Sequence, residues 1–529
     1  MRSQWPHIVL AVWICGWALV QAQVSWQTAL PDGPRSFNSP DETANYFFSR
    51  RIGSGLPVAA PAVPDDASGV VHPRSMLVYR GRLVPATFLG LPVWYGQVGR
   101  LAGVGVLPYL TPVIAAIGVF AFYYLLRQWF AVSVAWWSAA LMPLVPPWWY
   151  YSARGLFHNV PFLALLLLGG GGLASGFKRR QRIPMLLGGA ALGAALSLRP
   201  SEAVWVLPLC AIAGGYHRRQ LGGLGVAGAG ALFAALPVLL HQAATFGSPF
   251  GTGYLLPAAH AADGASSVVA ALVPFGFHPR RALGNGFRFI FLLLPALAWP
   301  AALGGLVAAA RWRRLPAVQR WYLGATVLAA GWLVAYYGSA ELSDNLDPAA
   351  LTLGVSYVRY WLPVYLALLP LAVIGANALL RLVRNRWVRT VTLTGVLAGM
   401  SWWSVQLTVR EPRDGLAAAV RAVQAGYRKR AAVVAQVPPG AIIVTERSDK
   451  IFFPALAVMP TLFDHQVQLA LPELLTHYPV YWYTFMDDQS IAPLRQQLLP
   501  QGVALADPVV IDRREAAPER LFSLRQLTP

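Results

Sequence analysis

Long apolar runs fill the first 410 residues of the chain and alternate with short polar segments. A helix of roughly 17–25 apolar residues is long enough to cross a bilayer. The pattern predicts about eleven such helices, at 8–24, 101–126, 131–149, 157–177, 183–198, 201–216, 221–246, 286–310, 321–340, 357–380 and 390–409. The runs at 183–198 and 201–216 are short, so a hinged pair is an alternative to two full spans. The predicted fold class is an α-helical polytopic membrane protein.

Two connecting segments, 25–100 and 247–285, are too long to be simple loops. Within the first, the stretch 84–99 is apolar, broken by glycine and proline, and shorter than a span. Such a stretch predicts a helix that lies in the membrane interface. Trp and Tyr gather near the ends of predicted spans, at 148–151 and 335–338, where aromatic anchors are typical.

The last segment, 411–529, has a different pattern. Residues 415–434 have the apolar spacing of a helix, and 441–445 is a short buried-strand run after a Pro-Pro-Gly turn. A second strand-like piece lies near 508–511. We therefore expect a small α/β domain at 411–529, after a transmembrane domain at 1–410. The tail has no phosphate-cradling glycine pattern, so no cofactor is predicted.

Composition supports a membrane protein. The 529 residues are 56% hydrophobic and only 12% charged, whereas an ordinary soluble domain has about 25% charged residues. This composition argues against a water-soluble enzyme, and the high apolar content excludes a disordered basic chain. Cys15 and Cys210 both lie in apolar runs, so no disulfide framework is predicted.

The formal charge of +20 is unevenly distributed. Residues 411–529 contain twelve basic and twelve acidic residues, so the whole excess lies in the hydrophobic part. There the basic residues are mostly Arg and are dispersed between apolar runs, which favours membrane topology over nucleic-acid binding. They cluster in alternate gaps, which the positive-inside rule assigns to the cytoplasm. These gaps contain Arg2, Arg127, Lys178, Arg179, Arg180, Arg182, Arg218, Arg219, Arg311, Arg313, Arg314, Arg320, Arg381, Arg384, Arg386 and Arg389.

All ten carboxylates of residues 1–410 then fall on the outer side. They are Asp32, Asp41, Glu42, Asp65, Asp66, Glu202, Asp263, Glu341, Asp344 and Asp347. The odd number of predicted helices places the tail on the outer side too. Residues 1–24 also resemble a cleavable signal peptide, with a small-residue site at 20–22, but we favour a retained helix. Both alternatives put the following segment outside.

The most informative local motif follows the first predicted span. In Pro40-Asp41-Glu42-Thr-Ala-Asn45-Tyr46-Phe-Phe-Ser-Arg50-Arg51-Ile-Gly53-Ser-Gly55, two adjacent carboxylates open a helical stretch at the membrane surface. A structural alternative is that Asp41, directly after Pro40, is only the N-cap of this helix. A carboxylate in this position is also a candidate general base.

This motif resembles the first outer loop of C-type integral-membrane glycosyltransferases (GT-C), which include protein O-mannosyltransferases and bacterial aminoarabinose transferases. Three further stretches resemble that family: Thr245–Tyr254 (TFGSPFGTGY), Ser356–Pro363 (SYVRYWLP) and Arg199–Glu202 (RPSE). The resemblance implies a membrane enzyme that moves a sugar from a polyprenyl-phosphate donor to an acceptor on the outer face. It further implies that Asp41 is the base and that Glu42 is a supporting or alternative carboxylate. A one-step displacement would invert the anomeric configuration.

Such a reaction also needs cations where charge builds on the leaving phosphate. Arg154, Arg199 and Arg359 are expected on the outer side at the ends of apolar runs, and Arg presents a fork suited to phosphate oxygens. Alternatives for each Arg are snorkelling to lipid head groups or helix-end pairing, such as Arg199 with Glu202. The full set of predicted substrate-binding residues is Arg154, His158, Arg199, Glu202, Tyr254, Arg359 and Tyr360. Asp344 and Asp347 either face the sugar or lie in a solvated loop, which we favour.

The chain departs from the family in one place, because 146–158 lacks the second acid that many members carry there. Its histidines are scattered without short ligand spacing, so no tightly bound metal is expected. The expected partners are the lipid-linked donor, the bilayer and an acceptor that is a protein, lipid or glycan. Two other functions stay open, a lipid-linked glycan transporter and a polysaccharide polymerase or ligase. The predicted location is the bacterial inner membrane, with the active site and tail on the periplasmic side.

Overall fold

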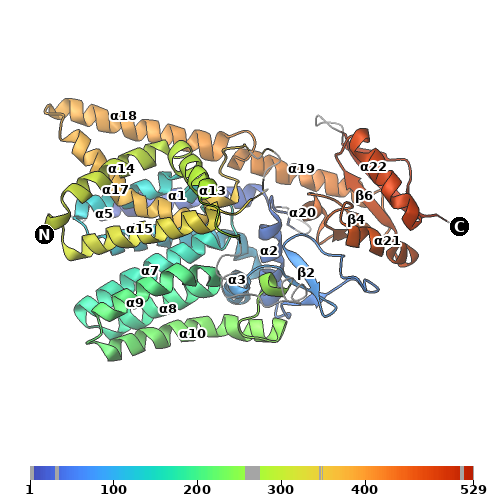
Figure 1. The fold of residues 1–529 in the computed structure, drawn as a ribbon, viewed down its shortest axis with the longest axis horizontal. Helices are drawn as coiled ribbons and strands as arrows, with labels where there is room; N and C mark the ends of the chain where they lie inside the picture. Colours follow the sequence, from blue (N-terminus) through green and yellow to red (C-terminus); the bar gives the residue numbers. More distant parts are fainter. Residues whose placement is uncertain are drawn as a thin grey trace. The chain divides into compact units, whose positions relative to one another are not determined.

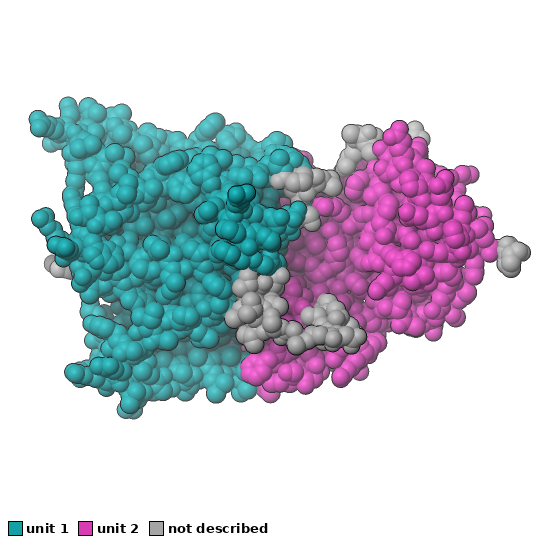
Figure 2. Space-filling model, in the orientation of Figure 1, with its two compact units in different colours: residues 1–25, 108–239, 261–418 teal, residues 26–107, 240–260, 419–529 magenta. Residues whose placement is uncertain are grey.

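The computed structural model describes residues 5–29, 35–256, 275–342, 344, 347, 349–512 and 518–527. The chain forms two compact units (Figure 2). Unit 1 consists of residues 1–25, 108–239 and 261–418, and unit 2 of residues 26–107, 240–260 and 419–529. By contacts, the first long connecting segment therefore groups with the tail. The division into domains 1–410 and 411–529 stays a prediction. Asp32, Asp263 and most of the apolar piece within 247–285 lie outside the described residues.

Unit 1 is helical, and each of the eleven predicted apolar runs contains at least one of its helices (Figure 1). The order is α1 (Trp5–Gln27), α4 (Leu110–Leu126), α5 (Val132–Leu141), α6 (Pro146–Ala153), α7 (Asn159–Arg179), α8 (Arg182–Leu198), α9 (Ala203–Tyr216), α10 (Leu221–Phe246), α13 (Pro279–Gly286), α14 (Pro295–Ala310), α15 (Ala317–Gly338), α16 (Ser356–Tyr360), α17 (Leu362–Leu380) and α18 (Arg386–Val405). Short 3₁₀ or π turns extend several of them.

The helices of the predicted runs differ in length and apolar character. In the described part of the chain, five helices are long and apolar enough to cross a bilayer, or seven if each of two bent pairs counts as one. The pair 182–216 bends by 113°, which agrees with the hinge alternative, and 279–310 bends by 104°. The other predicted runs form helices that are shorter or less apolar than these. The run in 132–144 forms only a short apolar helix, and aromatic, small and polar residues lower the mean hydropathy of α15 and α18. The protein is nevertheless a multi-pass membrane protein.

Close helix packing in unit 1 depends on small residues. Where α14 meets α17, a Cβ on Gly304 would lie 1.9 Å from the carbonyl oxygen of Leu371, and one on Gly375 would lie 2.0 Å from that of Pro300. Only glycine fits at both crossing points. Close approach of this kind is typical of helices in membranes, where packing rather than the hydrophobic effect drives association.

The first part of unit 2 is formed by residues 40–102. Helix α2 (Pro40–Gly53) packs against α3 (Gly90–Ala102), and β1 (Ala60–Pro61), β3 (Arg82–Pro85) and β2 (Met76–Tyr79) form a small antiparallel sheet. The predicted interfacial helix at 84–99 is wrong in its bounds, because the stretch begins in β3 and its helix starts at Gly90. Its apolar residues Leu91, Val93 and Tyr95 are buried within the protein, which explains their hydrophobic character.

The tail forms the predicted α/β domain. It runs α19 (Leu416–Val434), β4 (Ile442–Val444), α20 (Asp449–Phe452), β5 (Ala457–Met459), α21 (His465–His477), β6 (Val480–Thr484), α22 (Asp488–Leu498), β7 (Val503–Leu505), β8 (Val509–Asp512) and β9 (Glu519–Gln526). The sheet order is β5-β4-β6-β9-β7, with β8 paired to β9. Helices α21 and α22 pack on one face of this sheet, because their apolar residues share one buried cluster with those of β4 and β6. Figure 1 labels both helices next to β4 and β6. The predicted helix and both predicted strands are confirmed.

Two residues of the first long segment complete the core of this sheet. Val70 and Val71 are 7% and 4% exposed and belong to the same buried cluster as Val444, Met459 and Trp482. Asp66 holds this piece of chain by accepting hydrogen bonds from the backbone amides of both valines, at 3.2 and 2.8 Å. The segment before β2 is therefore part of the fold of the C-terminal domain.

Candidate functional site

Unit 1 gathers three arginines and several aromatic rings at the ends of its helices. We call this group the arginine–aromatic cluster. It consists of Tyr150, Arg154, Phe157, Arg199, Glu202, Tyr337, Arg359 and Tyr360. Helix α6 ends one residue before Arg154, α8 ends one residue before Arg199, and α16 carries Arg359. Helix termini thus bring together residues that are about 200 positions apart in the sequence.

Guanidinium groups and rings alternate through the cluster. The Cζ of Arg154 lies 5.4 Å from the centre of the Tyr150 ring and 5.2 Å from that of Phe157. The Cζ of Arg359 lies 4.9 Å from the centre of the same Phe157 ring and 5.1 Å from that of the Tyr360 ring. The Tyr360 ring is in turn 5.2 Å from the Cζ of Arg199. Cation–π contacts of this kind stabilise arginine charge where water is scarce.

Arg199 is held by a carboxylate. Glu202 accepts hydrogen bonds from Nε and Nη2 of Arg199 at 3.1 and 2.7 Å, and from the hydroxyl of Tyr337 at 2.7 Å. Trp205 Nε1 donates to its other oxygen at 2.5 Å. The helix-end pairing considered for Arg199 is therefore present. Glu202 is 2% exposed and fixes Arg199 rather than facing an open space.

Arg154 and Arg359 have different surroundings, formed by hydroxyls and rings. Arg154 is 9% exposed and its Nη1 donates to the hydroxyl of Tyr150 at 2.8 Å. Arg359 Nη2 donates to the hydroxyl of Tyr360 at 3.3 Å, while the backbone carbonyl of Arg359 accepts from Asn159 at 3.0 Å. Because the Arg154 and Arg199 side chains are buried within unit 1, they do not snorkel outward.

His158 is also buried, at 9% exposed, and directly precedes α7. Unit 1 therefore contains six of the seven predicted substrate-binding residues. The seventh, Tyr254, belongs to unit 2, where its 55% exposed side chain packs edge-on against Phe88 with ring centres 4.8 Å apart. Its assignment to substrate binding stays a prediction.

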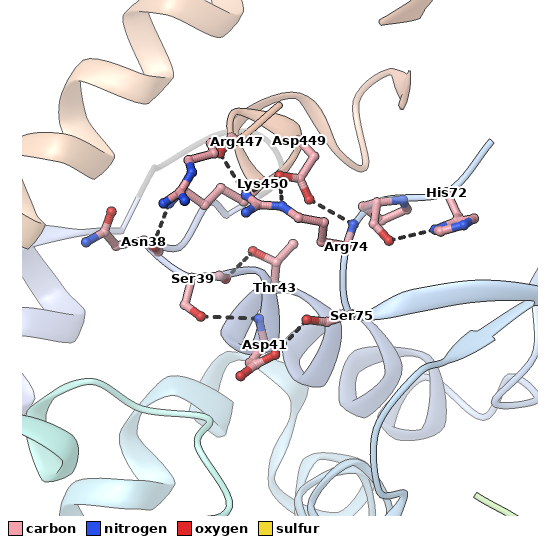
Figure 3. A network of polar contacts seen from close by, with 11 residues as sticks. Asn38, Ser39, Asp41, Thr43, His72, Arg74, Ser75, Arg447, Asp449 and Lys450 are labelled. Carbon is pink, nitrogen blue, oxygen red and sulfur yellow. Dashed lines mark hydrogen bonds and ion pairs between the residues drawn. The ribbon is translucent and has the colours of Figure 1, made fainter. Parts of the chain in front are cut away.

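The candidate base lies in unit 2, at the start of α2 (Figure 3). The hydroxyl of Ser75 donates to Oδ1 of Asp41 at 2.6 Å. The N-cap of α2 is Ser39, whose Oγ accepts from the backbone amide of Asp41 at 3.2 Å. The alternative that Asp41 is the N-cap is therefore wrong, because Ser39 and Pro40 already begin the helix. Glu42 is 3% exposed, so it lies inside the protein.

No protein-family model and no curated protein matches the sequence. Its structure is similar to that of ArnT from Cupriavidus metallidurans bound to undecaprenyl phosphate, with a TM-score of 0.52 and 13% identity over 99% of this chain and 98% of that one. It is also similar to the oligosaccharyltransferase of Archaeoglobus fulgidus tethered with an acceptor peptide, with a TM-score of 0.50 and 12% identity over 89% of this chain and 69% of that one. The chain has the GT-C fold.

Within this GT-C fold, Phe157, Tyr150 and Tyr337 were missed as cluster members. The sequence did single out the aromatic runs that contain Tyr150 and Tyr337, but as membrane anchors. That interpretation is wrong for these two residues and for Trp148, which are between 0% and 5% exposed. The Tyr337 ring instead stacks on Tyr360 with centres 4.3 Å apart. Sequence position at a helix end does not distinguish a ring facing lipid from one facing a buried guanidinium.

Asp344 and Asp347 are exposed, as expected for a solvated loop. Asp344 also has a structural contact with the cluster-bearing helix, since it accepts from the backbone amide and the hydroxyl of Ser356 at 2.8 and 2.9 Å. Ser356 is the first residue of α16, so this carboxylate stabilises the start of the helix that carries Arg359. Among the described residues of this GT-C chain, no group of three or more His, Cys, Asp or Glu forms a candidate metal site.

Proposed function

We propose that the protein is an inverting glycosyltransferase that moves a sugar from a polyprenyl-phosphate-linked donor to an acceptor hydroxyl. The observation that carries this proposal is the arginine–aromatic cluster in a chain with the GT-C fold. Arg154 is buried and Arg359 is partly buried among aromatic rings, and ionisable groups held inside a membrane protein are typical of binding sites for charged ligands. The solved structure of ArnT contains undecaprenyl phosphate, a ligand with such an anionic group.

In the proposed reaction, the acceptor oxygen forms a bond to the anomeric carbon while the bond from that carbon to the phosphate oxygen breaks. The hydroxyl proton passes to the carboxylate of Asp41, and the electron pair of the broken bond stays on the released polyprenyl phosphate. A single displacement inverts the configuration at the anomeric carbon. A positioned general base typically contributes 10²–10⁴-fold to such a step.

We assign the leaving phosphate to Arg154 and Arg359. Arg199 already donates two guanidinium hydrogen bonds to Glu202 and another to Tyr337. We therefore assign it to holding the Tyr360 ring, whose centre lies 5.2 Å from its Cζ. The planar guanidinium groups of Arg154 and Arg359 both contact the ring of Phe157, at 5.2 and 4.9 Å from its centre. Two forks of this kind suit the several oxygens of a phosphodiester or phosphomonoester.

We further propose that the reaction takes place on the outer face of a bacterial inner membrane, without a tightly bound metal ion. What supports this side is charge segregation, because the arginine-rich gaps contain no carboxylate while Asp41, Asp344 and the net-neutral tail lie in the alternate set of loops. The same segregation leaves few charges in the middle of the helices, which favours surface chemistry over transport.

The test is label transfer by the full-length protein in lipid nanodiscs that contain a polyprenyl-phosphate sugar labelled in the sugar. We expect label to move to an acceptor in an envelope extract and Asp41→Asn to abolish this movement while the donor still binds. Asp65→Asn is the matched control, since Asp65 is an exposed acid of the same outer segment and Asn tolerates its positive φ of 58°. Full activity of Asp41→Asn would refute the assignment. Movement of the intact donor across liposomes without transfer would support a transporter instead.

A further inference from the structure

The residues around Asp41 are held by two adjacent residues of the C-terminal domain. We propose that Asp449 and Lys450 position the Asp41 carboxylate, acting through Arg74, Ser75 and Asn38. The proposal rests on the function proposed for Asp41. It gives the C-terminal α/β domain a specific task in the reaction, namely to set the direction of the catalytic carboxylate.

The strongest contact is the one between Arg74 and Asp449. Oδ1 of Asp449 accepts from Nε and Nη2 of Arg74 at 2.9 and 2.6 Å, while Oδ2 accepts from the backbone amide of Arg74 at 2.9 Å. The carboxylate of Asp449 is fully buried, and Arg74 Nη2 also donates to the carbonyl of Arg447 at 2.9 Å. Asp449 thus fixes both the side chain and the backbone of Arg74 (Figure 3).

Fixing the backbone of Arg74 matters because the next residue is Ser75. Ser75 has a φ of 62°, in the left-handed region that residues other than glycine seldom adopt. Such a conformation persists only where the surroundings impose it. Before Ser75 in the chain, Asp449 holds Arg74. The carbonyl of Ser75 itself accepts a hydrogen bond from the backbone amide of Ala86 at 3.0 Å. In this conformation the hydroxyl of Ser75 donates to Asp41 at 2.6 Å.

Lys450 holds the second segment. Its Nζ donates to the carbonyl of Asn38 at 2.7 Å, one residue before the N-cap Ser39. Ser39 in turn binds the amide of Asp41 at 3.2 Å and the hydroxyl of Thr43 at 3.0 Å. Two neighbouring residues of α20 therefore hold the two segments, 38–39 and 74–75, that form these hydrogen bonds with Asp41. A carboxylate held by such a shell loses rotational freedom before the substrate arrives, which is how positioning residues assist catalysis.

The α20 region also contacts α2 through apolar groups. The ring of Phe453, which directly follows α20, packs edge-on against Phe47 of α2 with centres 4.9 Å apart. Val70 and Val71, a few residues before Arg74, are buried in the core of the C-terminal sheet. The polar contacts therefore join surfaces that are already packed, so a change at Asp449 is transmitted to Ser75 rather than absorbed by a flexible linker.

The test compares Asp449→Asn and Ser75→Ala with Glu519→Gln in the full-length protein. Glu519 is a matched control because it forms a buried ion pair with Lys429, at 2.6 Å, in the same domain but outside the Asp41 network. We expect Ser75→Ala to lower kcat about ten- to hundredfold, the factor expected for a lost hydrogen bond to a charged group. KM for the lipid donor should stay within about twofold of the wild-type value.

The pH profile separates positioning from general damage. Loss of the Ser75 hydrogen bond disfavours the ionised carboxylate, so the acidic limb of kcat should move to higher pH in Ser75→Ala and Asp449→Asn but not in Glu519→Gln. The double variant Ser75→Ala/Asp449→Asn should be no slower than the slower single variant, because both changes act through one contact.

Hydrogen–deuterium exchange gives a readout that does not need activity. Amides of residues 38–45 should exchange faster in Asp449→Asn than in Glu519→Gln and wild type. Equal exchange in all three proteins would overturn the positioning proposal. So would a Ser75→Ala enzyme with normal kcat and an unmoved acidic limb, provided that Asp41→Asn is inactive. A fully active Asp41→Asn protein would instead remove the proposed function on which the inference rests.

Discussion

One carboxylate oxygen of Glu202 accepts two hydrogen bonds from Arg199, one from Nε at 3.1 Å and one from Nη2 at 2.7 Å. The pair is almost wholly buried, with side chains 8% and 3% exposed. Its position beside the Tyr337 and Tyr360 rings makes it the support of the arginine–aromatic cluster, while the other two arginines are assigned to the ligand. The pair therefore separates two kinds of arginine, one structural and two for binding.

This pair yields a prediction about stability. Glu202→Gln leaves the guanidinium of Arg199 buried without its countercharge, and breaking a buried pair in this way costs about 3–5 kcal/mol. We expect a clear fall in the thermal unfolding temperature of the detergent-solubilised protein. The double variant Arg199→Met/Glu202→Leu should recover most of the loss, because it removes both charges together. A Glu202→Gln protein as stable as wild type would show that the pair does not support the cluster.

Arg154 and Arg359 should affect donor binding rather than stability. Replacing either with Gln removes a charge-assisted contact to phosphate, for which we expect a ten- to hundredfold loss in kcat/KM, as is typical of a lost hydrogen bond to a charged group. Inhibition by free polyprenyl phosphate should weaken in parallel. Arg313→Gln is the control, since Arg313 is exposed in an arginine-rich gap. Unchanged inhibition in both variants would place the phosphate elsewhere.

Neighbouring glycines of α14 allow a matched test of helix packing. A Cβ on Gly304 would lie 1.9 Å from the carbonyl oxygen of Leu371, whereas a Cβ on Gly305 would meet nothing within 4 Å. Gly304→Ala should therefore push α14 away from α17 and destabilise the protein by about 1–3 kcal/mol. Gly305→Ala should be neutral or slightly stabilising, because alanine is the better helix former. Thermal unfolding of the two variants measures the difference, and equal stability would contradict the observed close packing.

The buried carboxyl of Glu446 predicts a pH effect in the C-terminal domain. Burial raises the pKa of Glu446, against the lowering effect of its hydrogen bond from Trp482 Nε1 at 2.7 Å. A raised folded pKa contributes stability that is fully present below the unfolded value and is lost as pH rises through the folded value. Glu446→Gln should therefore gain in unfolding temperature relative to wild type as pH rises from 4 to 8. Glu473→Gln, at an exposed position, should show no such trend.

A final prediction concerns metal dependence. Because the proposed chemistry places a carboxylate base and arginine forks where other enzymes use a cation, sugar transfer should continue after exhaustive treatment with EDTA. Initial rates before and after chelation, and after addition of Mg²⁺ or Mn²⁺, measure this directly. Loss of activity that either ion restores would show that a metal takes part, and would turn attention to the carboxylates near Asp41.

The sequence predicted helices and strands better than it predicted whether their side chains face lipid or protein. Apolar periodicity located α19 and strand β4 within about one residue of their observed bounds. It did not distinguish burial in lipid from burial in protein, because both environments select the same residues. For this reason the aromatic runs at 148–151 and 335–338 predict membrane anchors, although Tyr150 and Tyr337 are buried within the protein.

The site shows the same limit. Charge and helix-end position were enough to select Arg154, Arg199 and Arg359, which the fold brings into one cluster. Phe157, whose ring contacts two of these arginines, has no sequence feature that distinguishes it from other phenylalanines. Ser75 was also missed, since its role depends on a backbone conformation that is imposed by Asp449, 374 positions later in the sequence.

The burial of Val70 and Val71 has a consequence for the folding of the chain during synthesis. They are synthesised early, but the strands that cover them come from the last hundred or so residues. Until those strands are synthesised, the segment that contains Val70 and Val71 therefore has an uncovered apolar edge. Truncation before residue 440 should leave the segment around Val70 and Val71 prone to aggregation and to proteolysis, even when the helices of unit 1 have formed.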